Sequence, residues 1–142
     1  MAIEYISGDP LQTTAHVLYF GMNVQGRIES GKFETALHTR FPAAFSGFSR
    51  QCQAQKIKPG MVWYWRDAQP ALGFMVIRES PFGATRLRYV DAVLLSLARD
   101  HQRQGVTSAA IVLPRSEPDE IKQMIGRWLG KLALPVTVYE GV

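Results

Sequence analysis

The chain has 142 residues, of which 46% are hydrophobic, and its 16 Lys and Arg against 12 Asp and Glu give a formal net charge of +4. This length closes one hydrophobic core and is short for two, so we expect a single domain over residues 1–142. The positive charge favours anionic partners, without the block of like charges that is typical of a nucleic-acid-binding tail. The single Cys52 excludes an intramolecular disulfide. With no apolar run of about 18 residues and no basic-then-apolar start, the sequence predicts a cytoplasmic protein that does not enter a membrane.

The N-terminal half alternates short apolar runs with helical periodicity. Ile3–Ile6 and Ala15–Gly21 are predicted strands. Phe33–Phe41 is a predicted helix that stops at Pro42, because the proline ring disfavours helical geometry in the residue before it. Pro42 then suits the first turn of a second helix over Ala43–Ala54.

The C-terminal half continues the alternation from a predicted hairpin, whose strands Met61–Arg66 and Leu72–Ile77 flank a turn. Two helices and two strands are predicted beyond the hairpin, in the order Thr85–Gln104, Ser108–Leu113, Asp119–Leu132 and Val136–Tyr139. Strands separated by helices predict an α/β fold with a mixed, largely parallel sheet covered on both faces. Ligand sites in such folds lie where the strand ends meet the following loops.

The stretch from Gly21 to Phe41 joins an apolar strand to a helix through a loop that contains glycine. Such a connection gathers backbone N–H groups and the positive end of a helix dipole, which suits a phosphate. Lys32 adds a positive charge, although an ordinary turn with Ser30 or Gly31 as helix cap explains the same residues. A nucleotide triphosphatase loop is disfavoured, because Phe33 stands where Mg²⁺ coordination requires a Ser or Thr hydroxyl.

Several short motifs follow one another in a consistent order over nearly the whole chain. They are IEYISGDPL, Gly31-Lys32, Arg40-Phe41-Pro42, Lys58-Pro59-Gly60, Gln104-Gly105-Val106-Thr107, Leu113-Pro114-Arg115 and Val136-Thr137-Val138-Tyr139. This succession resembles a macro domain, specifically the branch of the terminal ADP-ribose glycohydrolases and the DNA ADP-ribosyl glycohydrolase antitoxins. The resemblance implies a three-layer sandwich that binds ADP-ribose or a related nucleotide, without a cofactor. ADP-ribosylated nucleic acid or protein is the larger partner that it implies.

The resemblance assigns binding roles to individual positions. Asp9 matches the acidic residue that accepts a hydrogen bond from the adenine amino group, and Tyr139 matches an aromatic residue beside the adenine. Asn23 lies near the family's ribose-side polar residue. Taken without the family, Asp9 belongs to a plain turn and Tyr139 to the core, and Pro10 has no N–H to offer an adenine ring nitrogen. The family's first phosphate-contacting loop is matched by Gly31, Lys32 and Phe33.

Two departures from the family pattern concern catalysis. The family's glycine-rich second phosphate loop carries a catalytic Asp, whereas here Arg115 leads through the glycine-free run 116–120 into a helix, with Ser116 as the predicted cap. Arg78 stands where the family has a catalytic lysine, and a guanidinium is a poor nucleophile. Arg78 and Arg115 remain candidate phosphate ligands. Glu79, Glu117 and Asp119 are possible acid–base groups that are otherwise solvated surface charges.

Three functions stay open at this point. The first is binding of ADP-ribose or a related ligand with reduced hydrolysis or none, and the second is ADP-ribosyl glycohydrolase activity. The third is a scaffold that has lost the nucleotide. A metal site is not expected, because His16, His38 and His101 show no ligand spacing with each other or with Cys52.

Overall fold

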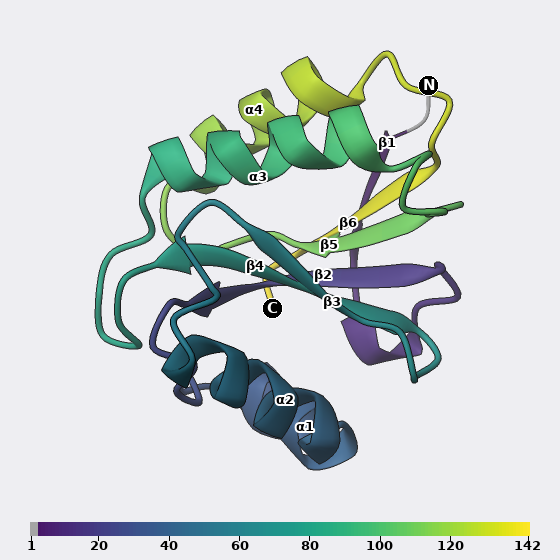
Figure 1. The fold of residues 1–142 in the computed structure, drawn as a ribbon. Coiled ribbons are helices and arrows are strands. Elements are labelled where there is room, and N and C mark those ends of the chain that lie inside the picture. The colour runs from purple at the N-terminus through teal and green to yellow at the C-terminus, as the bar shows by residue number, and fades with distance from the viewer. Residues whose placement is uncertain (1–2) are drawn as a thin grey trace.

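The computed structural model describes residues 3–142, and its centre is a six-stranded sheet (Figure 1). Its strands are β1 (Ile3–Ser7), β2 (Val17–Asn23), β3 (Val62–Trp65), β4 (Ala71–Arg78), β5 (Ala109–Val112) and β6 (Val136–Glu140). They lie in the order β1-β6-β5-β2-β4-β3, and every neighbouring pair is parallel except β3 with β4. The mixed, largely parallel sheet and the antiparallel hairpin are therefore confirmed.

Helices cover both faces of this sheet, as the alternation of periods predicts. One face carries α1 (Lys32–Arg40) and α2 (Pro42–Gln53), and the other carries α3 (Leu87–Asp100) and α4 (Pro118–Leu129) (Figure 1). A short 3-10 turn, η1 (Pro10–Gln12), follows β1. Pro42 is in the first turn of α2, as expected. Within residues 3–142, no helix combines the length and the apolar composition that crossing a bilayer requires.

The core has two halves, because successive side chains of a strand point to opposite faces of the sheet. In β2, Leu18 and Phe20 belong to the half under α1 and α2, and Val17 and Tyr19 belong to the half under α3 and α4. Each of the four is at most 3% exposed. The central strand β2 therefore packs against both helical layers.

Both predicted ends of α3 are wrong. The helix predicted over Thr85–Gln104 begins at Leu87, because the N–H of Arg86 donates to the carbonyl of Ile77 and keeps Arg86 extended. It ends at Asp100, and turns follow up to Gly105. An extended residue tied to β4 cannot continue a helix.

The predicted cap of α4 is also wrong. Pro118 takes the first helical position, so the cap is Glu117 and not Ser116. Glu117 has a left-handed backbone with φ of 51°, and its side chain makes no capping hydrogen bond. The helix ends at Leu129 instead of Leu132. The connection from β5 to α4 is therefore a tight turn with a strained residue at its end.

Candidate functional site

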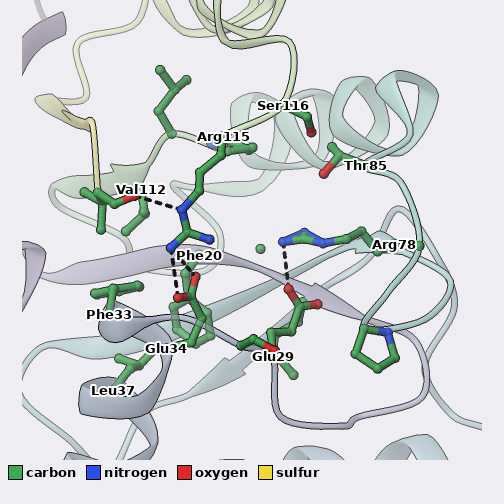
Figure 2. A pocket seen from close by; sticks show the side chains of 18 of the residues that line it. Phe20, Glu29, Phe33, Glu34, Leu37, Arg78, Thr85, Val112, Arg115 and Ser116 are labelled. Atoms are coloured by element: carbon green, nitrogen blue, oxygen red, sulfur yellow. Dashed lines mark hydrogen bonds and ion pairs between the residues drawn. The ribbon is translucent and has the colours of Figure 1, made fainter.

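A cavity of about 580 Å³ lies at the carboxyl ends of the central strands, where the fold class predicts a ligand site. It is lined by the ends of β2 and β4, by the β2–α1 connection, by residues 81–85 and by the β5–α4 connection (Figure 2). Phe20, Phe33 and Leu37 give it apolar walls. The charged lining groups are three carboxylates and two guanidiniums, those of Glu29, Glu34, Glu117, Arg78 and Arg115.

A buried polar network forms one side of the cavity. Asn23 is fully buried. Its Nδ2 donates to Glu29 Oε2 at 3.0 Å and to the Arg27 carbonyl at 2.9 Å. Its Oδ1 accepts a hydrogen bond from the Arg27 N–H. Glu29 is 8% exposed and pairs with Arg78 at 2.9 Å. Burial raises the pKa of the Glu29 carboxyl, against the opposing effects of Arg78 and of the hydrogen bond from Asn23. Asn23 therefore holds the β2–α1 loop rather than pointing into open space.

Arg78 reaches Glu29 from the last position of β4, across the end of β2 (Figure 2). Its guanidinium packs on Gly21, where an added Cβ would lie 2.9 Å from Nη1 and 2.8 Å from Ile77 Cδ1. Among the described residues, Nη1 is buried without a hydrogen-bond partner. The glycine at position 21 thus makes room for an arginine whose charge is already matched by Glu29.

A second ion pair crosses the cavity from the β5–α4 connection to the first turn of α1 (Figure 2). Arg115 Nη2 donates to Glu34 Oε1 at 3.0 Å and to Oε2 at 3.2 Å, and Nε donates to the Val142 carbonyl at 2.9 Å. The Arg115 side chain is 58% exposed and that of Glu34 is 20% exposed. Gly31, the cap of α1, has φ of 142°, and a side chain on it would collide with Glu34 Oε1. The Glu34 carboxylate therefore lies over the beginning of α1.

The predicted site residues fall into two groups. Phe33, Arg78 and Arg115 line the cavity, and Asn23 supports it. Lys32 is exposed at the first position of α1, outside the lining. Tyr139 pairs with Ile6 in the β1–β6 register and Asp9 lies two residues beyond β1, and neither lines the cavity. The Asp9 carboxylate accepts from the Leu11 N–H and caps η1, while Tyr139 is 6% exposed in the core.

Sequence reasoning missed Glu29 and Glu34, which pair with the two cavity arginines. Both look like ordinary solvated carboxylates in the sequence, and their partners come from β4 and from the β5–α4 connection. Of the acid–base candidates, Glu117 lines the cavity, whereas Glu79 accepts from the Tyr89 hydroxyl outside it. Over residues 3–142, no three His, Cys, Asp or Glu side chains gather in a group that would hold a metal ion.

Comparison with solved structures shows the fold. No protein-family model matches the chain, and no curated protein matches it either. The macrodomain of Thermus aquaticus DarG superimposes with a TM-score of 0.88 at 22% sequence identity, and the match covers 97% of each chain. The macrodomain of Mycobacterium tuberculosis DarG superimposes with a TM-score of 0.87 at 18% sequence identity, and the match covers 96% of each chain. Thermosipho africanus DarTG in complex with ADP-ribose matches with 0.86 at 15%, over 96% of this chain and 41% of that one. The protein has the macrodomain fold, and its structure resembles DarG macrodomains.

Proposed function

We propose that the cavity binds ADP-ribose or a related nucleotide through its phosphates, with little or no hydrolysis. The observation that carries this function is the convergence of Arg115 and the beginning of α1 on one cavity at the strand ends. A guanidinium and a helix N-terminus are both suited to phosphate oxygens. A macrodomain-like structure, that of DarTG, is known in complex with ADP-ribose, which supports the same class of ligand here.

The proposed positions of the ligand parts follow from the same geometry. The phosphates face Arg115 and the amide groups at Gly31, and Phe33 packs against the adjoining sugar. Asp9 and Tyr139 remain the proposed adenine contacts, which requires the nucleoside to extend from the cavity toward the ends of β1 and β6. Lys32, exposed beside the entrance, then attracts the anion from solution.

Weak hydrolysis follows from what surrounds the proposed ribose position. Arg78 carries a guanidinium, which is a poor nucleophile, and its side chain is paired with Glu29. The β5–α4 connection contains no glycine and ends at Glu117, which adds negative charge near the phosphates. Loss of acid–base or covalent participation removes about 10²-fold or more in rate. The arrangement therefore fits binding better than turnover.

Two experiments test this proposal. Calorimetric titration with ADP-ribose at low salt should show one ligand per chain, and Arg115→Gln should weaken it about ten-fold, because a charged hydrogen bond to phosphate is lost. Glu120→Gln, an exposed carboxylate outside the cavity, is the control for altered surface charge. Incubation with ADP-ribosylated DNA and with ADP-ribosylated protein should release little ADP-ribose. Absence of binding, or binding that ignores Arg115, contradicts the proposal.

Glycohydrolase activity is the second candidate, and the buried Glu29 is the observation that favours it. A carboxyl whose pKa is raised by burial, beside a cavity, is a suitable general acid or base. If the protein is an enzyme, rapid release of ADP-ribose is expected to disappear in Glu29→Gln, while Glu79→Gln, outside the cavity, keeps it. If both variants release ADP-ribose slowly and at the same rate, the result supports binding without hydrolysis.

A further inference from the structure

The cavity's two arginines are neutralised to very different degrees. Arg78 and Glu29 are 16% and 8% exposed, and Asn23 holds the carboxylate from its other side. The Arg115 side chain is 58% exposed, and its carboxylate partner comes from α1. An ion pair that is open to water is held weakly, whereas removing one partner of a buried pair is strongly unfavourable. Arg115 is therefore the arginine that can change its partner.

Glu34 occupies the place that a ligand anion would take. Its carboxylate lies over Gly31 at the beginning of α1 and accepts two contacts from one nitrogen of Arg115. The helix dipole and Arg115 both stabilise an anion there, whether it is a carboxylate or a phosphate. Figure 2 shows Arg115, from the β5–α4 connection, and Glu34, from the first turn of α1, pointing toward each other.

We propose that Glu34 is a built-in competitor for Arg115, and that a phosphate-bearing ligand enters by exchanging with the Glu34 carboxylate. This inference rests on the proposed function of the cavity and adds a determinant of its affinity. In the free protein, the Arg115–Glu34 pair joins the β5–α4 connection to α1 across the cavity. In the complex, Arg115 turns to the phosphate, and Glu34 moves into solvent.

A double-mutant cycle tests the exchange. ADP-ribose and, separately, inorganic pyrophosphate are titrated into the wild type, Glu34→Gln, Arg115→Gln and the double variant, at low and high salt. Glu34→Gln should bind about five-fold more tightly than the wild type, because Arg115 is no longer shared. In the Arg115→Gln background the same substitution should gain less than about two-fold. Glu120→Gln controls for the lost negative charge, and thermal unfolding shows that all variants are folded.

Each outcome distinguishes exchange from simple repulsion by Glu34. An equal gain in both backgrounds means that Glu34 repels anions without competing for Arg115, and it overturns the exchange. No gain in Glu34→Gln also overturns it. If pyrophosphate shows the coupling but ADP-ribose does not bind, the exchange stands and the proposed nucleotide function fails. If neither ligand binds to any of the four proteins, both proposals fail.

Discussion

The β2–α1 connection, residues 24–31, and the β5–α4 connection, residues 113–117, line the same cavity but are held by different means. In the first, Glu29 is buried, accepts a hydrogen bond from Asn23 at the end of β2 and pairs with Arg78. In the second, Arg115 is more than half exposed and pairs with the partly exposed Glu34. The first connection is therefore held by a buried polar network. The second presents a cation whose ion pair is open to water.

This difference separates stability from binding. A buried polar group that loses its partner costs its desolvation energy, while an exposed group recovers most of that energy from water. Substitutions in the Asn23–Glu29 network should therefore change the free energy of unfolding more than those at the Arg115–Glu34 pair. The exposed pair should instead control affinity.

Removal of the buried carboxylate should have the largest effect. Glu29→Ala leaves the Arg78 guanidinium without its counter-charge, and the free energy of unfolding should fall by about 3 kcal/mol. Glu34→Ala, at the exposed pair, should cost less than about 1 kcal/mol. Urea unfolding followed by tryptophan fluorescence measures both. Equal losses in the two variants would show that the connections do not differ as described.

Loss of the loop-holding amide should have the next largest effect. Asn23→Ala removes two donated hydrogen bonds and one accepted one, which should cost about 2 kcal/mol. The backbone amide of Arg27 should exchange with solvent faster, because it loses its acceptor. Hydrogen exchange read by mass spectrometry detects this change. Gln25→Ala, an exposed position in the same loop, should stay within about 0.5 kcal/mol of the wild type.

Relief of the strained residue in the second connection should stabilise the protein slightly. Glu117 has a left-handed backbone, which glycine adopts without steric cost, so Glu117→Gly should gain about 0.5–1 kcal/mol. It also removes a carboxylate from the cavity and should tighten ADP-ribose binding. Glu120→Gly, inside the first turn of α4, should lose about 1 kcal/mol in the same thermal unfolding experiment. A loss at position 117 would contradict the account of this turn.

The smallest expected effect is a pH dependence that arises from Glu29. Burial raises the pKa of this carboxyl, so between its unfolded and folded values the native state binds more protons than the unfolded state. Stability from this group is therefore full below the unfolded pKa, near 4.3 in ordinary peptides, and declines as pH rises through the folded pKa. The free energy of unfolding of the wild type, relative to that of Glu29→Gln, should fall over this range. A difference that rises with pH would show a lowered pKa.

Most of the fold is predictable from the sequence because its elements are encoded locally. Apolar runs and helical periodicity give the strands and helices in the right order, and Pro42 starts α2 as its ring geometry requires. The wrong beginning of α3 comes from one long-range hydrogen bond, that from Arg86 to Ile77. The wrong cap of α4 comes from Pro118, which leaves Glu117 as the residue before the first helical position.

The site is predictable to a smaller extent. The position of the cavity follows from the rule for strand ends, and three of the predicted residues, Phe33, Arg78 and Arg115, line it. Nothing in the sequence indicates a role for Glu34, since its partner Arg115 is 81 residues away. The same holds for Glu29, which reads as a loop carboxylate until the tertiary structure places Arg78 beside it. Which charged residues pair across a cleft depends on the topology of the fold. Local sequence patterns therefore do not predict such ion pairs.

A crystal structure of the protein with ADP-ribose would show whether Arg115 leaves Glu34 to bind a phosphate. The account predicts the diphosphate between the beginning of α1 and the β5–α4 connection, with Arg115 turned from Glu34 to a phosphate oxygen. The Asn23–Glu29–Arg78 network should be unchanged. An empty cavity in crystals grown with saturating ADP-ribose, or a ligand bound away from Arg115, would contradict it.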